Sequence, residues 1–478
     1  MTGRRPAQNS QKGGQDIAAV CPRELTGTGR KMKQPYSFTY HSLQEVQNRA
    51  DELGLSLPLS EDVSVLNTPL TIGKAVIANR MGVAPMEGVD SEPDGRPGEY
   101  TIRRYKRFAE GGAGLIWFEA VSIVQEGRSS LKQLLLTKET LPAYQRMNDE
   151  IKEAGLKANG YAPYLVMQAN HSGRYSRPNA AALPQPIVAF KNPYIEKDRP
   201  LDDSCVATTD YLKQLEDTFG EAAFLAKRAG FDAVDIKSCH GYLLAELAGA
   251  FTREDAYGGS FENRFRLLFN AIRNAQAAED DHFQVLARVG VYDNIPYPYG
   301  FGMNRDGTLT MDMSEPLKLM DQLSNQLHVP FVNVTIGDPH YDAYVTRPFN
   351  LDNKFLARED PLIGVSRIFN AAREIKKHVP GLAVSASAPS YMRQFAPNLA
   401  AGAVQQGFCD HICFGRLSFA NPNFANEIRK DGRLSHGCLS CSKCSDLIRA
   451  GVWTGCVIYD KEIYLPVYQE LHRRQGDA

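Results

Sequence analysis

The chain has 478 residues, a formal net charge of −1 and nine cysteines. This balanced charge leaves no electrostatic footprint for nucleic acid or an anionic membrane, and no apolar run approaches the roughly 18 residues that a membrane span needs. Nine cysteines are too few for a disulfide scaffold, and four of them lie between Cys438 and Cys456, which predicts a metal centre in a reducing compartment, the cytoplasm.

The first 60 residues are interpreted as an N-terminal extension. Residues 1–35 are rich in Gly, Gln, Lys, Arg, Ser and Thr, so disorder is expected there, and Met32 is an alternative translation start. The basic N-terminus is followed by no apolar stretch, so no signal peptide is expected. Leu43, Val46 and Ala50 share one face of a predicted helix over residues 41–53.

A repeating pattern follows, in which a short apolar run leads into polar residues and then into an amphipathic stretch. Eight runs predict strands: Met81–Met86, Gly114–Ala120, Tyr164–Gln168, Ala233–Ile236, Gln284–Val289, Phe331–Val334, Leu382–Ser385 and His411–Phe414. The predicted helices are Tyr100–Glu110, Ala143–Ala154, Asp210–Arg228, Glu262–Asn274, Glu315–Leu327, Ser366–Lys377 and Ala396–Gln405. Strands that alternate with helices indicate a parallel sheet, and eight repeats favour an α/β fold of the (β/α)8 TIM barrel type over residues 61–430. No G-x-G-x-x-G follows any strand, which argues against a Rossmann domain.

Three longer connections, residues 169–207, 290–312 and 335–363, follow predicted strand ends, where barrel enzymes build their sites. The first two contain several aromatic residues: Tyr175, Phe190, Tyr194, Tyr292, Tyr297, Tyr299 and Phe301. Either these rings pack the loops onto the scaffold, or they form the walls of a substrate pocket.

Three chemically active side chains follow the fourth predicted strand. The apolar run Phe231–Ile236 reads as a buried parallel strand, and Lys237, His240 and Tyr242 come within the next six residues. Taken alone, His240 and Tyr242 could equally cap a helix or pack in the core. Because α/β folds bind ligands past the carboxyl ends of their strands, this position is also a candidate active site.

The same segment extends into a long and irregular motif. It reads AGFDAVDIKSCHGYL from Ala229 to Leu243 and then R-x-D-x-YGGS-x-ENR-x-R from Arg253 to Arg266. This pattern resembles the Old Yellow Enzyme family of flavin-dependent ene-reductases, and the resemblance covers roughly residues 65–460.

The resemblance implies an FMN site. NRMGVAPMEG (Asn79–Gly88) is similar to the family's NR-x-x-x-x-PM signature and implies that the backbone of Ala84, Pro85, Met86 and Glu87 lies beside the isoalloxazine ring. Relatives often have Cys or Thr where this chain has Glu87, and an anion there would oppose a negative reduced flavin unless it turned away or were protonated.

Further flavin contacts are implied at other strand ends. By this resemblance Ala120 allows close approach, Gln168 meets the pyrimidine edge and Arg288 lies at flavin N1 and O2, although a structural salt bridge is the alternative for a buried arginine. Gly415 and Arg416 are implied at the phosphate, together with backbone N–H groups near Ser387.

The resemblance also implies the reaction. FMN is reduced by NAD(P)H or an electron-carrier protein, and hydride then passes to the β-carbon of an α,β-unsaturated carbonyl substrate. Relatives hold the carbonyl oxygen with His and a second His or Asn, at the positions of Lys237 and His240. Lys237 departs from that pattern: its ammonium would stabilise an enolate or pair with an anionic group. Tyr242 matches the proton donor to the α-carbon.

The C-terminal cysteines Cys438, Cys441, Cys444 and Cys456 read C-x2-C-x2-C-x11-C. Four thiolates can hold zinc or a 4Fe–4S cluster, and three crowded cysteines followed by one more favour the cluster. The pattern resembles the iron–sulfur subgroup of the same family, the 2,4-dienoyl-CoA reductases and trimethylamine dehydrogenases. We therefore expect a small iron–sulfur segment over residues 431–478, without the dinucleotide-binding half that follows in those relatives. Cys409 and Cys413 are expected in the core, and Cys239 lies near the site without a role.

Two other functions compete with an ene-reductase. One is a flavin-dependent amine dehydrogenase of the trimethylamine type, and the other is an electron-transfer subunit of a larger complex. A homo-oligomer is compatible with the sequence, whereas nucleic acid and membrane partners are not expected.

Overall fold

A computed structural model describes residues 37–179, 183–349 and 359–476. The disorder predicted for residues 1–35 and the alternative start at Met32 lie outside these residues. Ser42 caps the helix expected near the N-terminus, α1 (Leu43–Glu52), by accepting a hydrogen bond from the Glu45 N–H at 3.2 Å.

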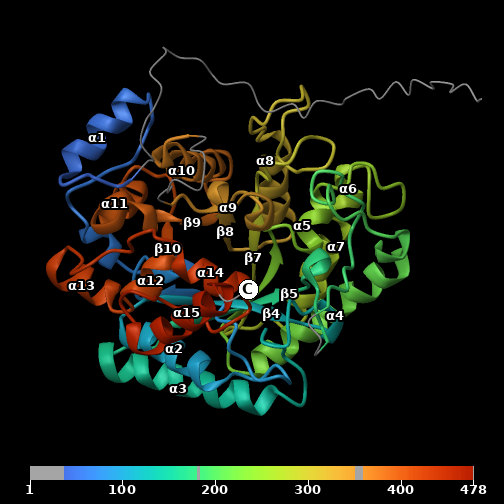
Figure 1. Ribbon diagram of the computed structural model, residues 1–478, viewed down its shortest axis with the longest axis horizontal. Coiled ribbons are helices and arrows are strands. Elements are labelled where there is room, and N and C mark those ends of the chain that lie inside the picture. The colour runs from blue at the N-terminus through green and yellow to red at the C-terminus, as the bar shows by residue number, and fades with distance from the viewer. Residues whose placement is uncertain (1–36, 180–182, 350–358, 477–478) are drawn as a thin grey trace, which may run out of the picture.

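Eight parallel strands form a closed barrel in the order β10-β3-β4-β5-β6-β7-β8-β9 (Figure 1). They are β3 (Met81–Val83), β4 (Leu115–Ser122), β5 (Tyr164–Asn170), β6 (Ala233–Ser238), β7 (Gln284–Gly290), β8 (Phe331–Thr335), β9 (Ala383–Ser387) and β10 (His411–Phe414). Nearly every strand residue is buried. Helices cover the outer face of the sheet, and the inner face is packed inside the barrel. The predicted (β/α)8 barrel is confirmed.

The helices of the outer layer follow their strands as predicted (Figure 1). They are α2 (Glu99–Glu110), α3 (Leu141–Asn159), α4 (Thr209–Arg228), α6 (Phe261–Arg264), α7 (Arg266–Gln276), α8 (Ser314–Asp321), α10 (Pro361–His378) and α11 (Ala396–Gln405). The single helix predicted over residues 262–274 is two, since the backbone at Phe265 leaves helical geometry. The helix expected over residues 315–327 is α8 continued by a π-helical turn, Gln322–Gln326.

Short elements escaped the prediction. β1 (Leu70–Ile72) and β2 (Ala75–Ile77) form an antiparallel hairpin whose apolar side chains pack against Trp117, Leu286 and Phe331 inside the barrel. Three-residue strands are too short for a recognisable alternation. The hairpin therefore closes the end of the barrel where the strands begin, and the opposite end is left for the long connections.

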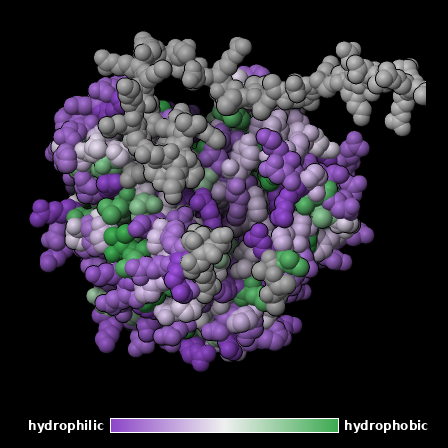
Figure 2. All heavy atoms as spheres, viewed as in Figure 1, coloured by the Kyte–Doolittle hydropathy of each residue, from purple (hydrophilic) through white to green (hydrophobic). Residues whose placement is uncertain are grey.

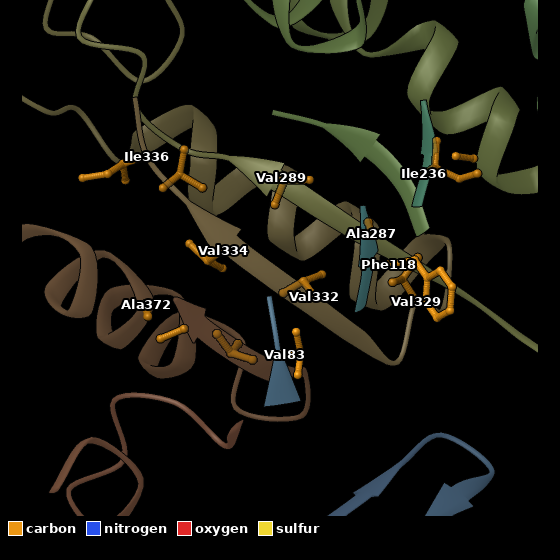
Figure 3. Close-up of a cluster of buried hydrophobic side chains, with 14 of the residues drawn as sticks. Val83, Phe118, Ile236, Ala287, Val289, Val329, Val332, Val334, Ile336 and Ala372 are labelled. Carbon is orange, nitrogen blue, oxygen red and sulfur yellow. The ribbon is translucent and has the colours of Figure 1, made fainter. Parts of the chain in front are cut away.

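Alternation along the strands separates two environments. Figure 3 shows Ala287 and Val289 of β7 and Val332 and Val334 of β8 within the hydrophobic cluster that surrounds the barrel. Their intervening neighbours therefore face the interior. The face of the molecule shown in Figure 2 is mostly hydrophilic, with hydrophobic residues in small patches.

The chain after β10 forms α12 (Arg416–Ala420), α13 (Phe424–Asp431), α14 (Lys443–Arg449) and α15 (Lys461–Gly476). Leu447, Val457 and Tyr464 make a small core within this part. The Asp460 carboxylate pairs with Arg103 of α2 at 2.8 Å and fastens the segment to the barrel. The division at residues 60 and 430 remains a prediction. In the part of the chain that the structure describes, no helix is long and apolar enough to cross a bilayer.

Candidate active site

Strand register brings several polar residues, some of them predicted, together at the carboxyl end of the barrel. Gln168 is paired with Asp235, Lys237 with Arg288, and Arg288 with Asn333. All five are buried, none exposing more than 5% of its surface. Ala120 is paired with Gln168 and extends the layer to β4. Lys237 belongs to β6 itself, not to the loop after it.

Asp235, which was not predicted from the sequence, holds this layer together. Its carboxylate accepts hydrogen bonds from Trp117 Nε1 at 2.8 Å, Gln168 Nε2 at 2.7 Å and the Arg288 N–H at 2.5 Å. Burial raises the pKa of Asp235 to about 6 even though these donors lower it. The sequence around Asp235 does not show which groups would donate hydrogen bonds to it. This role is therefore visible only in the folded structure.

The guanidinium of Arg288 is buried in this part of the barrel. Its Nε donates to Asn333 Oδ1 at 3.2 Å, and no carboxylate of the described residues forms an ion pair with it. The amide of Asn333 is also buried, beside the Cys413 thiol. Buried polar groups need partners. A cation and an amide donor directed into the barrel mouth fit the oxygen- and nitrogen-rich edge of a flavin.

The loop after β3, Ala84–Gly88, rests on a buried ionic network. The Gly88 N–H donates to Glu119 at 2.8 Å, and Arg104 pairs with the same carboxylate at 2.5 Å and with Asp90. A methyl group at Gly88 would lie 2.1 Å from Arg104 Nη2, so any side chain there would displace the buried guanidinium. The network thus fixes the loop that the sequence assigns to the flavin ring.

Replacing Arg104 by methionine is expected to destabilise the protein by about 3–5 kcal/mol, because Asp90 and Glu119 would remain buried without their cation. The control is Lys106→Met on the same helix, which breaks a half-exposed pair with Glu150 and should cost less than about 1 kcal/mol. Urea-unfolding midpoints of both variants measure the difference, and equal losses would show that the network does not support the fold.

Glu87, the departure from the family pattern, has its pKa raised to about 8 by burial and then by Glu119. A carboxyl with this pKa is mostly protonated at pH 7. The protonated form removes the conflict between an anion and a reduced flavin.

A stability difference should follow from Glu87. The pKa of Glu87 in the folded protein lies above the ordinary value of 4.5. The protonated carboxyl therefore contributes its full stabilisation to the folded state below pH 4.5, and this contribution is lost as the pH rises towards 8. Glu87→Gln has no proton to lose. We therefore expect it to gain stability over the wild type between pH 5 and 9, by on the order of 1 kcal/mol or more. Urea unfolding at pH 5, 7 and 9 tests this, and a pH-independent difference would contradict it.

Lys237 and Tyr242 are in direct contact. The Lys237 ammonium lies 3.9 Å from the centroid of the Tyr242 ring. Tyr242 is the residue before α5 (Leu243–Ala248), but its side chain makes no capping hydrogen bond. No hydrogen bond to its hydroxyl is found among the described residues, and burial, followed by Glu87 and Asp338, raises its pKa well above the ordinary value. It therefore presents a protonated phenol, as a proton donor requires.

His240 is placed by a strained turn. His240 and Gly241 have φ of 66° and 69°, and a methyl group at Gly241 would lie 2.2 Å from Asp338 Oδ2. The turn brings His240 Nε2 to 3.2 Å from Thr335 Oγ1 at the end of β8. Burial, then Arg288 and Lys237, lower the pKa of His240 well below its ordinary value, so the imidazole is neutral.

Two long connections supply Tyr175, one of the aromatic residues noted in the sequence, and His340, which the sequence did not single out. Tyr175 donates from its hydroxyl to Asp338 Oδ2 at 3.3 Å, and its ring stacks on His340 with centroids 3.7 Å apart. Tyr242 lies 5.6 Å from the His340 ring. The aromatic-wall interpretation therefore fits Tyr175. No sequence pattern or spacing marks His340 as a site residue. Its role is visible only because the loops after β5 and β8 lie against each other in the structure.

The position implied for the flavin phosphate also has an unused donor. Arg416 Nη2 donates to the Pro348 carbonyl at 2.6 Å, whereas Nη1 is buried without a partner in the described chain. A methyl group at Gly415 would make an ordinary contact, 3.5 Å from Met86 Sδ, so the protein alone does not require glycine there. Ser387 donates its hydroxyl to the Val334 carbonyl at 3.2 Å, and its backbone role remains a prediction.

All four C-terminal cysteines line one pocket, which Arg416 also borders. Their thiols are free of disulfides. The N–H groups of Ser440 and Tyr459 donate to Cys438 Sγ and Cys456 Sγ, both at 3.4 Å. In residues 37–179, 183–349 and 359–476, no group of three or more His, Cys, Asp or Glu side chains is arranged to hold a metal ion, so the 4Fe–4S cluster remains a prediction. Cys409 and Cys413 are buried in the core, as predicted.

Known proteins share this chain's pattern. A sequence model of the NADH:flavin oxidoreductase / NADH oxidase family matches residues 65–369. An NADPH dehydrogenase of Listeria monocytogenes serotype 4a (strain HCC23) is 30% identical over 266 residues, which are 53% of this chain and 73% of that protein.

Solved structures share the fold. A 2-naphthoyl-CoA reductase in complex with 2-naphthoyl-CoA superposes with a TM-score of 0.67 at 19% identity, over 83% of this chain and 57% of that one. An old yellow enzyme homologue from Zymomonas mobilis gives a TM-score of 0.59 at 23% identity, over 82% of this chain and 98% of that one. The chain thus spans little more than half of the first structure and nearly all of the second.

Proposed function

Because the chain belongs to the NADH:flavin oxidoreductase / NADH oxidase family, we propose that it is an FMN-dependent ene-reductase acting on α,β-unsaturated carbonyl compounds. The observation that carries this proposal is the arrangement of Lys237, His240 and Tyr242. A cation, a neutral imidazole and a protonated phenol lie at the same end of the barrel as the unpaired Arg288. This is the donor set that a carbonyl reduction requires.

The residues that would hold FMN are those implied by the family. They are the backbone of Ala84, Pro85, Met86 and Glu87, with Ala120, Gln168, Arg288, Gly415 and Arg416. The buried Nη1 of Arg416, which has no partner among the described residues, supports this assignment. When bound, FMN supplies the hydride that it has received from NAD(P)H.

The protein's own part in the reaction is to hold one oxygen and deliver one proton. We propose that Lys237 and His240 donate to the substrate's carbonyl oxygen and stabilise its charge as the enolate forms. Tyr242, whose hydroxyl is not engaged by any described residue, donates its proton to the α-carbon.

We also propose that Cys438, Cys441, Cys444 and Cys456 hold a 4Fe–4S cluster. The shared pocket and the two N–H donors to sulfur support this, since such donors stabilise thiolate ligands. NAD(P)H is the proposed electron donor, and an electron-carrier protein is the alternative. Reduced thiols are consistent with the cytoplasm as the compartment.

One observation bears on the rival function. An amine dehydrogenase must bind a substrate that is cationic at neutral pH, but Lys237 occupies this pocket with no ion pair in the described chain to neutralise it. Repulsion between like charges disfavours an amine substrate.

The proposal is tested by purifying the protein without oxygen, counting its iron and recording its visible spectrum during titration with NAD(P)H and then with 2-cyclohexenone. We expect a flavin spectrum that NAD(P)H bleaches and the enone restores. A colourless, iron-free protein would contradict the proposal, and bleaching by an amine without a response to the enone would select the amine dehydrogenase.

A further inference from the structure

Lys237 is a buried lysine at the carboxyl end of β6. Its side chain is only 5% exposed, and no ion pair or hydrogen bond to its ammonium is found in the described chain. The ammonium lies 3.9 Å from the centroid of the Tyr242 ring. Burying an unpaired ammonium is costly, so a protein that retains one has a use for it at a ligand.

Burial lowers the pKa of Lys237 to about 8, although the neighbouring Cys239, Glu87 and Asp235 raise it. Asp235 lies two residues before Lys237 on β6 and accepts hydrogen bonds from Trp117 and Gln168. Burial raises the pKa of the Glu87 carboxyl to about 8, so this group is mostly protonated at pH 7. With a pKa of about 8, Lys237 is itself still mostly charged at pH 7.

Further cations surround the opening. Burial lowers the pKa of His340, and the charges that lower it further are those of Lys237, Arg177, Arg347 and Arg449. Arg177 is exposed, and the described residues give it no ion pair. Arg449 forms a long ion pair of 3.7 Å with Asp446, and because both side chains are partly exposed this pair is weak. The approach to Lys237 is thus electropositive from the loops after β5 and β8 and from α14.

We infer that the natural substrate is an α,β-unsaturated carboxylate, whose carboxylate is received by the Lys237 ammonium after passing the arginine rim. The inference rests on the proposed function. Adding hydride to a conjugated carboxylate places a second negative charge on the same group, which a neutral donor pair stabilises poorly and an ammonium stabilises well. The alkene gains hydride at the β-carbon and a proton at the α-carbon from Tyr242, while NAD(P)H is oxidised to NAD(P)+.

The test is calorimetric binding of trans-cinnamate and trans-cinnamamide to the purified holoprotein. The two probes have nearly the same shape and differ in charge. We expect cinnamate to bind at least about tenfold more tightly, with an advantage that shrinks at high salt. Lys237→Gln should abolish the preference and Lys237→Arg should retain most of it. Lys157→Gln, an exposed lysine on α3 remote from the barrel mouth, should leave the preference unchanged.

The two proposals fail in different ways. Equal binding of both probes to the wild type, or a preference that survives Lys237→Gln, would overturn the inference. Reduction of cinnamamide without binding of cinnamate would also overturn the inference of a carboxylate substrate, but it would support the ene-reductase proposal. Lys237-dependent binding of cinnamate without reduction of either probe would support the anion site and contradict the ene-reductase. If Lys237→Gln does not fold, the wild-type comparison and Lys237→Arg decide.

Discussion

Replacing Tyr242 by phenylalanine is expected to slow reoxidation of the reduced flavin by an enone about 10²–10⁴-fold, while reduction of the flavin by NAD(P)H stays nearly unchanged. The reason is that the substitution removes only the hydroxyl. The ring that contacts the Lys237 ammonium is kept, so the cation stays where it is. Stopped-flow measurement of the two half-reactions separates the effects.

Tyr175→Phe is the matched control for that experiment. Tyr175 lies in the same aromatic group, but its hydroxyl is already bonded to Asp338. It should change the enone reaction much less than Tyr242→Phe. If Tyr242→Phe slowed both half-reactions equally, Tyr242 would be structural rather than a proton donor.

Replacing Cys438 by serine is expected to remove nearly all iron and acid-labile sulfide from the purified protein. Cys438 is buried in the shared pocket and receives the Ser440 N–H, and serine is a poor ligand for iron–sulfur centres. Iron and sulfide assays under anaerobic conditions measure the loss. The α14–α15 segment, which has only a small apolar core, should also become more sensitive to protease.

Cys205→Ser provides the control for this experiment, since Cys205 lies in the connection after β5 and outside the pocket. It should retain full iron content. Zinc in place of iron in the wild type, or unchanged iron in Cys438→Ser, would contradict the cluster.

The barrel was predictable because strand signals are strong where both faces are buried. Short apolar runs such as Gln284–Val289 are typical of buried parallel strands when predicted helices alternate with them. The strand observed there, β7, is one residue longer than predicted. The β1–β2 hairpin was missed because its strands have three residues each. The break at Phe265 was missed because the apolar periodicity continues through it.

The site was predictable only in part. Strand-end residues such as Gln168 and Arg288 could be assigned from their position and the family resemblance, and strand register brings them side by side. Asp235 and Asn333 could not, because their roles depend on neighbours that are distant in sequence. The Arg104 network was invisible for the same reason, since its partners come from a loop, a helix and a strand.

The most direct test of the account is isotopic. The enzyme would turn over 2-methyl-2-cyclohexenone with nicotinamide cofactor deuterated at C4, and in a parallel experiment with unlabelled cofactor in D2O, with product labels located by NMR. Deuterium is expected at the β-carbon from the cofactor and at the α-carbon from solvent, and the α-carbon label should form much more slowly in Tyr242→Phe. A product without saturation of the double bond, or cofactor deuterium at the α-carbon, would contradict it.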